Sequence, residues 1–311
     1  MREQHVGVVW NPSKKITREE LEAALPDSAN LRISWYETSE DDPGRGATQQ
    51  ALDGGADVVL AVGGDGTVRA VAEHLAAVES SAELGIIPLG TGNLLARNLD
   101  IPIDDVPAAF ARALEGEAEP IDIGWVELTV DGESRRHAFT VMAGLGIDAH
   151  MISETKDELK DRAGWLAYVE SLGRAIPASE VIGMTLTAGG SDPVEEQAHT
   201  LLVGNCGTLV GGVNLMPDAD PSDGELDVLV LSAEGLGGWL DTLRNMAWDN
   251  GLKRLLRPDA TADSSTSTTH SRVTNLTVKL AEPRLVEIDG DELGETAEMV
   301  INIQPGAIRV R

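Results

Sequence analysis

Residues 57–67 read Asp-Val-Val-Leu-Ala-Val-Gly-Gly-Asp-Gly-Thr, and the rest of the chain is organised around this stretch. The five apolar residues 58–62 predict a strand that is buried on both faces. Apolar residues then recur at helical spacing from Val68 to Val78, which predicts an amphipathic helix. A buried strand therefore leads into a helix through a glycine-rich loop, residues 63–67.

The chemistry of this loop favours a phosphate ligand. The first N–H groups of a helix are unpaired and carry a partial positive charge, and glycines let the backbone approach an anion closely. A tight strand-to-helix turn is the alternative, and the glycine spacing matches neither the Walker A loop nor the dinucleotide fingerprint. Asp65 would repel a bare anion, so we expect a metal or a hydroxyl donor beside it.

The composition points to an acidic two-domain protein. The chain has 311 residues, enough for two cores, and its net charge of −28 comes from 52 acidic residues against 24 basic ones. Only six of the basic residues are lysines, a pattern typical of proteins that work in high salt, although an ordinary acidic protein remains the alternative. The charge argues against nucleic acid as a partner. It also disfavours docking on an anionic bilayer unless salt or a local patch offsets it.

The sequence also indicates where the protein works. Cys206 is the only cysteine, which excludes a disulfide within the chain and fits a reducing interior. The N-terminus does not resemble a signal peptide, and no apolar stretch has the length needed to span a bilayer. We therefore expect a cytoplasmic protein, at most peripheral at the inner face of a membrane.

Strand and helix patterns alternate over residues 1–122, which predicts a parallel sheet with helices on both faces. A second apolar strand, residues 84–87, leads into Gly-Thr-Gly-Asn at residues 90–93. Ligands of such sheets bind beyond the carboxyl ends of the strands, so the two glycine loops are expected to face one crevice. Thr91 and Asn93 offer a hydroxyl and an amide to a ribose or phosphate, although an ordinary turn is the alternative.

Residues 123–311 contain mainly short strand patterns separated by Gly, Asp and Pro turns, which predicts a mostly antiparallel β-sandwich domain. Helical patterns interrupt it at residues 163–176 and 237–256. The acidic turn at residues 220–225 suits either a hairpin or a hard-cation site. The turn at residues 289–292 could also present a general base, but its residues alone do not rank its three acids.

Several motifs in this order resemble the soluble lipid kinases, namely the bacterial-type diacylglycerol kinases and their sphingosine kinase relatives. The Gly-Gly-Asp-Gly-Thr element alone is shared with NAD kinases and loosely with phosphofructokinases, whereas the ordered set is more specific. The resemblance covers most of the chain, and its motifs lie at residues 63–67, 84–102, 122–124, 144–148, 205, 211–212, 217 and 223–227.

The resemblance implies a nucleotide-binding α/β domain, residues 1–122, and a β-sandwich lipid-substrate domain, residues 123–311, whose C-terminal tail packs back on the first domain. It implies transfer of the γ-phosphoryl group of ATP to the hydroxyl of diacylglycerol or a related lipid, in a cleft between the domains. It further implies Mg²⁺ as a cofactor, a lipid substrate met at a membrane surface, and a homodimer.

The resemblance also assigns roles to particular residues. Asp65, with Asp122 behind it, corresponds to a Mg²⁺ and water network, and Asp291 holds the position of the general base. Asp223, with the backbone carbonyls of Asp220 and Glu225, is similar to the family's second-domain metal site. The nucleotide-binding residues that we predict are Thr38, Gly63, Gly64, Asp65, Gly66, Thr67, Gly90, Thr91 and Asn93.

Three positions depart from the family pattern. Asp291 is one methylene shorter than the expected glutamate, which leaves Glu292 as an alternative base. Lys14 follows Ser13 where the family has glycine, and Leu94 stands where an acid is common. An NAD kinase and a regulatory protein that binds nucleotide and lipid without turnover are the rival functions.

Overall fold

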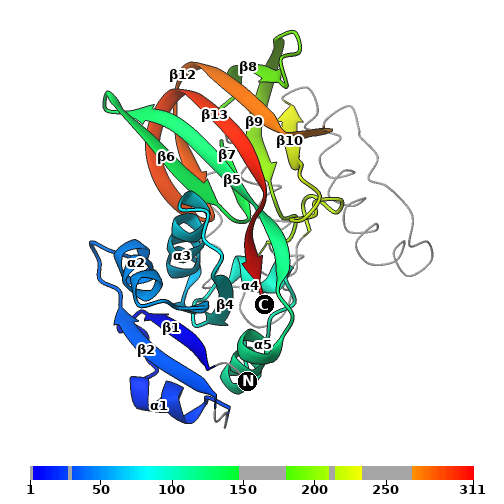
Figure 1. Cartoon of the computed structure of the whole chain (residues 1–311). Helices are drawn as coiled ribbons and strands as arrows, with labels where there is room; N and C mark the ends of the chain where they lie inside the picture. Colours follow the sequence, from blue (N-terminus) through cyan, green and yellow to red (C-terminus); the bar gives the residue numbers. More distant parts are fainter. Residues whose placement is uncertain (1–2, 27–29, 147–179, 210–213, 233–267) are drawn as a thin grey trace, which may run out of the picture.

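The computed structural model describes residues 3–26, 30–146, 180–209, 214–232 and 268–311. The first domain is a parallel sheet in the order β2-β1-β3-β4 with helices packed against it, as predicted (Figure 1). Its strands are β1 (Gln4–Trp10), β2 (Leu31–Glu37), β3 (Val58–Gly63) and β4 (Glu83–Pro88). Its helices are α1 (Arg18–Ala23), α2 (Arg45–Asp53), α3 (Asp65–Ala77), α4 (Leu94–Asn98) and α5 (Val106–Glu115).

Local signals explain where these helices begin. Thr17 and Glu20 form a reciprocal capping box at the start of α1. The Asp105 side chain accepts a hydrogen bond from the backbone N–H of Ala108 and so caps α5. All six residues of β3 are buried, in line with the apolar run that predicts a strand covered on both faces.

The second domain is mostly antiparallel, which confirms the predicted fold class. Many of its inward side chains form a second apolar cluster, whereas others, among them Trp125, Leu229 and Leu231, belong to the same cluster as the core of the first domain. The helical patterns at residues 163–176 and 237–256 lie outside the described residues. So do four apolar residues that the sequence offers either for a lipid pocket or for ordinary core, namely Trp165, Leu166, Trp239 and Leu240. The strands are β5 (Glu119–Val130), β6 (Glu133–Phe139), β7 (Met142–Leu145), β8 (Ile182–Ala188), β9 (Val194–Gly204), β10 (Leu226–Ser232), β11 (Thr268–Val273), β12 (Asn275–Ile288) and β13 (Asp291–Val310).

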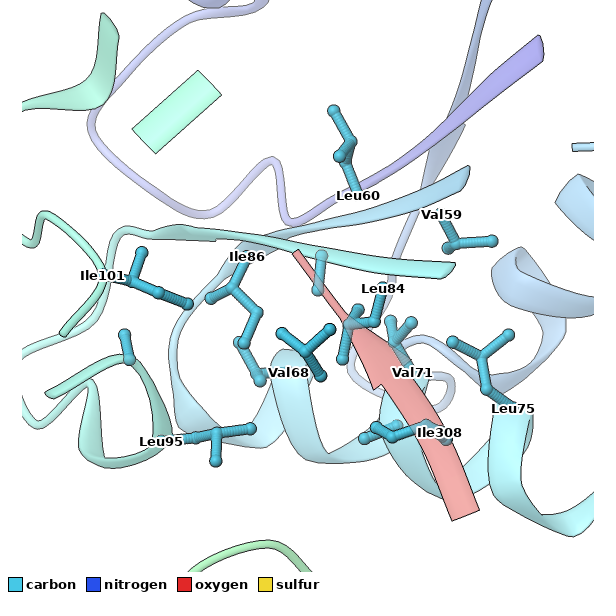
Figure 2. Packing of buried hydrophobic residues seen from close by; sticks show 14 of the residues in the cluster. Val59, Leu60, Val68, Val71, Leu75, Leu84, Ile86, Leu95, Ile101 and Ile308 are labelled. Atoms are coloured by element: carbon cyan, nitrogen blue, oxygen red, sulfur yellow. The ribbon is translucent and has the colours of Figure 1, made fainter. Parts of the chain in front are cut away.

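The last strand, β13, belongs to both domains. It pairs with β12 and β5 in the second domain and then runs down to the first domain, where Val310 pairs in parallel with Leu84 of β4 (Figure 1). Its pairing with β5 shifts between Gln304 and Ile308, which marks a bulge where the strand leaves one domain for the other. Ile308 then packs into the first core beside α3 (Figure 2).

Two sequence predictions differ from the observed strands. The apolar patterns at residues 273–280 and 285–288 predict two separate strands, whereas residues 275–288 form one long strand, β12, with an irregular register between Lys279 and Arg284. Most of β6 gave no strand signal, because its first residues are polar and exposed. Within the described residues, no helix is long and apolar enough to cross a membrane.

Candidate active site

The carboxyl ends of four parallel strands bring the predicted nucleotide residues to one edge of the sheet. Trp10 at the end of β1 is level with Glu37 of β2 and Val62 of β3. The N–H of Thr38 donates to the carbonyl of Trp10 at 2.9 Å. The N–H of Leu89, after β4, donates to the carbonyl of Gly63 at 2.7 Å. Thr38 and both glycine loops therefore lie together at this edge of the sheet.

The two glycine loops touch each other, and this contact explains why they need glycine. A Cβ on Gly90 would lie 2.7 Å from the Cα of Gly64, closer than real Cβ atoms approach. A Cβ on Gly63 would lie 2.6 Å from Oγ1 of Thr67, the residue that closes the first loop. A larger residue at Gly90 would push the two loops apart, and one at Gly63 would displace Thr67 within the first loop.

Asp65, the first residue of α3, links the two loops. Its Oδ2 accepts the N–H of Asn93 at 2.8 Å, and its Oδ1 accepts the N–H of Leu94 at 2.5 Å. The acid that was out of place at a bare anion site therefore holds the backbone of the second loop. Each carboxylate oxygen keeps a further lone pair, so Asp65 still fits a role beside a hydrated Mg²⁺.

The side chain of Asn93 closes the second loop on itself. Its Oδ1 accepts the N–H of Gly90, and its Nδ2 donates to the carbonyl of Gly90, both at 2.9 Å. Asn93 adopts a left-handed backbone with φ 49° and is buried. Its amide is thus used within the loop, which differs from the ligand role that we expected. Thr91 remains exposed and free to face a ligand.

Lys14 brings a positive charge to the first loop. A Cβ on Gly64 would lie 3.3 Å from the Lys14 Nζ, so the ammonium lies over the backbone of this loop. An ammonium there, together with the N-terminus of α3, suits a phosphate. The sequence showed Lys14 only as a departure from a family pattern, although its place in the loop that follows the strand β1 was a usable signal.

Asp291 reaches the same place from the second domain. It begins β13 directly after the two-residue turn Asp289–Gly290, whose φ values of 48° and 89° are those of the expected Asp-Gly hairpin. Its Oδ2 accepts a hydrogen bond from Nη2 of Arg69, on α3, at 2.5 Å. The same oxygen lies 3.7 Å from the position of a Cβ on Gly66. The carboxylate is therefore beside the first loop, and 56% of the side chain is exposed.

Glu73, on α3 one turn beyond Arg69, makes a further ion pair with Arg45 at the start of α2. Glu73 is buried, and this burial raises the pKa of its carboxyl, against the opposing effects of Arg45, Arg69 and a hydrogen bond from the backbone of Ala138. Because Ala138 belongs to β6, this contact holds α3 against the second domain. The contact helps to fix the distance between the first loop and the start of β13.

The three acids at residues 289–292 have different environments. Asp289 is buried and accepts four hydrogen bonds, from the N–H and hydroxyl of Thr140 and from the N–H groups of Val141 and Met142. Burial raises the pKa of the Asp289 carboxyl, and the backbone donors oppose that shift. Successive residues of a strand face opposite sides, so Glu292 faces away from the side on which Asp291 meets α3. Asp289 is thus structural, and Asp291 is the better placed base.

We expect replacement of Asp289 by asparagine to lower the free energy of unfolding by about 1–3 kcal/mol. The asparagine side chain keeps only one of the two acceptor oxygens. Its NH₂ group would lie against buried N–H and hydroxyl donors that then have no acceptor. Chemical denaturation at constant salt measures the change. Asp131→Asn is the matched control, because Asp131 occupies a similar Asp-Gly turn between β5 and β6 at φ 53° but is exposed. Equal losses in both variants would contradict the structural role of Asp289.

Asp122 ties the second domain to the bulge in β13. Its side chain is buried, its Oδ2 accepts the N–H of Gly224 at 2.7 Å, and its Oδ1 accepts the N–H of Gly306 at 2.6 Å. Its own N–H donates to the carbonyl of Pro221. Among the described residues, these hydrogen bonds lead to the acidic turn and the bulge rather than to Asp65. Its part in a shared Mg²⁺ network therefore stays a prediction.

In the acidic turn at residues 220–225, the carboxylates of Asp220, Asp223 and Glu225 already contact groups of the chain itself. Asp220 Oδ1 accepts both the N–H and the hydroxyl of Ser222, at 2.9 and 2.6 Å. The guanidinium of Arg272 lies 3.4 Å from a carboxylate oxygen of Asp223 and 3.6 Å from one of Glu225. In the part of the chain that the structure describes, no three His, Cys, Asp or Glu side chains are grouped as metal ligands would be.

Cys206 and the described histidines take no part in this site. Burial raises the pKa of the Cys206 thiol, which keeps the sulfur protonated and unreactive. Burial lowers the pKa of His74 and of His137, with the positive charge of Arg45 acting in the same direction. The site chemistry therefore rests on carboxylates, backbone N–H groups and basic side chains.

Comparison with known proteins defines the class to which this fold and site belong. Residues 5–126 match the diacylglycerol kinase catalytic domain, and residues 139–311 match the YegS C-terminal NAD kinase beta sandwich-like domain. Kinases of this class use a nucleotide as phosphoryl donor. The contact between Asp291 and α3 joins the two matched domains.

Individual relatives agree with this class. A probable lipid kinase YegS-like of Pseudomonas aeruginosa (strain UCBPP-PA14) is 33% identical, over 96% of this chain and 91% of its own. The diacylglycerol kinase of Bacillus subtilis is 28% identical over 75% of each chain. A crystal structure of a diacylglycerol kinase from Bacillus anthracis has the same fold, with a TM-score of 0.69 at 19% identity over 99% of this chain and 96% of its own. The chain belongs to the family of diacylglycerol kinases and YegS-like lipid kinases.

Proposed function

We propose that this protein transfers the γ-phosphoryl group of ATP to the hydroxyl of a diradylglycerol or related lipid. The observation that carries the proposal is the position of Asp291. A carboxylate from the second domain lies 3.7 Å from the position of a Cβ on Gly66, and so beside the loop that is suited to phosphate. A base and a phosphate site in one place are what transfer to a hydroxyl requires.

The first domain binds and orients the nucleotide. The N–H groups at the start of α3 and the ammonium of Lys14 face the phosphates, while Thr38 and Thr91 line the same sheet edge. Asp65 keeps the second loop in place and offers its remaining lone pairs to water on the metal. When bound with ATP, Mg²⁺ neutralises charge on the phosphate oxygens.

The second domain supplies the base. Asp291 takes the proton of the lipid hydroxyl as that oxygen bonds to the γ-phosphorus, and the bond from this phosphorus to the bridging oxygen breaks to release ADP. Arg69 holds the carboxylate toward the phosphates through its hydrogen bond to Oδ2. The exposed side of Asp291 leaves room for the acceptor.

The acceptor is a membrane lipid, so we propose that the protein contacts a membrane from the cytoplasmic side while the reaction occurs. Its net charge of −28 opposes approach to an anionic surface. At high ionic strength the Debye length falls to about 3 Å, which removes most of this repulsion. A homodimer stays part of the proposal on family grounds.

A kinase assay with labelled ATP and Mg²⁺ at high salt tests the function. Separate reactions contain diacylglycerol, a dialkylglycerol, a long-chain amino alcohol or NAD, each lipid presented in mixed micelles. We expect label in a glycerolipid and stoichiometric ADP. Label in NAD alone would favour an NAD kinase, and binding of ATP and lipid without ADP would favour a regulatory protein. Either result would overturn the proposal.

A further inference from the structure

The acidic turn of the second domain contains a positive charge that belongs to the chain itself. Arg272, at the end of β11, places its guanidinium among three carboxylates: Asp223 at 3.4 Å, Glu225 at 3.6 Å and Asp227 at 3.6 Å. Its Nη2 also donates to the backbone carbonyl of Asp218 at 2.6 Å. One side chain thus contacts both ends of the segment from residue 218 to residue 227.

A divalent cation bound to this turn would need the carboxylate of Asp223, which already contacts Arg272. Mg²⁺ and Ca²⁺ bind carboxylate and carbonyl oxygens at about 2.0–2.6 Å and require most of the coordination sphere to be oxygen. Arg272 already contacts two carboxylates of this turn and a neighbouring carbonyl. A guanidinium and a metal ion cannot share this position, because their charges repel and their volumes overlap.

The turn is also held at a particular place in the fold. Asp122 accepts the N–H of Gly224 within the turn and the N–H of Gly306 in the bulge of β13. The geometry of the turn is therefore linked to the segment through which β13 passes from one domain to the other. A cation that neutralises the carboxylates of Asp223 and Glu225 therefore also stabilises this connection between the turn and β13.

We propose that Arg272 is a built-in cation that takes the place of a divalent metal in the acidic turn, so that the second domain is stable without Mg²⁺ or Ca²⁺. Its guanidinium has five donors in a planar fork, enough to serve several oxygens at once. The requirement for Mg²⁺ in this protein then belongs to the nucleotide alone. The inference does not depend on which lipid is phosphorylated.

Thermal unfolding without nucleotide tests the proposal. The full-length protein is measured in EDTA and then in excess Mg²⁺ or Ca²⁺, at constant high ionic strength. We expect its Tm to stay within about 1 °C throughout, and the Tm of Arg272→Ala in EDTA to be lower by about 3–6 °C. Mg²⁺ or Ca²⁺ should restore part of that loss in the variant, because the freed carboxylates can then bind a cation.

Arg135→Ala is the matched control. Arg135 has the same exposed fraction as Arg272, 42%, but among the described residues its one ion pair is with Glu133 at the surface. Its loss should change the Tm by less than about 2 °C, with no response to metal. If Arg272→Ala fails to fold, Arg272→Lys replaces it in the test, because lysine keeps the positive charge but lacks the planar fork of donors. The Tm of Arg272→Lys in EDTA should lie below that of the native protein and above that of Arg272→Ala. A native protein that EDTA destabilises by several degrees would overturn the proposal, as would an Arg272→Ala variant with unchanged Tm.

Discussion

Replacement of Asp65 by alanine should reduce turnover at least about 10³-fold. The variant loses the acceptor for the N–H groups of Asn93 and Leu94, so the second loop is no longer held against the first. It also loses the carboxylate that we place beside the hydrated metal. Production of ADP at saturating Mg²⁺, ATP and lipid measures the rate, and nucleotide affinity is measured in parallel by titration.

Asparagine at the same position separates the two contributions. Its side-chain oxygen can still accept one of the two N–H groups, so nucleotide affinity should stay near that of the native protein. The negative charge is gone, so turnover should remain low. Near-normal turnover in Asp65→Asn would contradict a role of the Asp65 carboxylate beside the metal, and would leave Asp65 only as the link between the two loops.

Asp105→Ala is a suitable control for these variants. Asp105 is also an acid whose oxygen accepts a backbone N–H at a helix start, in this case that of Ala108 at 3.0 Å. Its loss should cost about 1 kcal/mol of stability, as expected for a helix cap, without a change in turnover. A comparable fall in rate would mean that the effect of Asp65→Ala is general destabilisation.

The fold was predictable because its signals are local. The apolar run of residues 58–62 and the Asp289–Gly290 turn each need only their own neighbours in sequence to be interpreted. The same holds for the capping box of α1. Most of the strand β6 was hidden, because its first four residues are polar and exposed and give no alternation of apolar and polar side chains.

The site was only partly predictable because its decisive contacts are distant in sequence. Asp289 is separated from the N–H of Thr140 by 149 residues, and Arg69 from Asp291 by 222 residues. Only the folded chain shows that one acid is enclosed by backbone donors while the other faces the glycine loop. Arg272, on β11, likewise lies beside Asp223 only in the folded chain.

Replacement of Asp291 by asparagine should lower kcat by about 10²-fold or more, with little change in the KM for lipid. The amide keeps the size of the side chain and can still accept the hydrogen bond from Arg69, but it cannot take the proton of the acceptor. Binding should therefore survive while the chemical step slows. Initial rates over a range of lipid concentrations in mixed micelles measure both constants.

Glu292→Gln decides between the two neighbouring acids. Its side chain faces away from α3, so we expect a rate near that of the native protein, whereas the reverse pattern would move the role of base from Asp291 to Glu292. Asp291→Glu lengthens the side chain by one methylene, to that of the glutamate that is usual in the family. If the carboxylate acts as the base beside Gly66, this variant should keep far more activity than Asp291→Asn, because charge and basicity remain while only the reach changes.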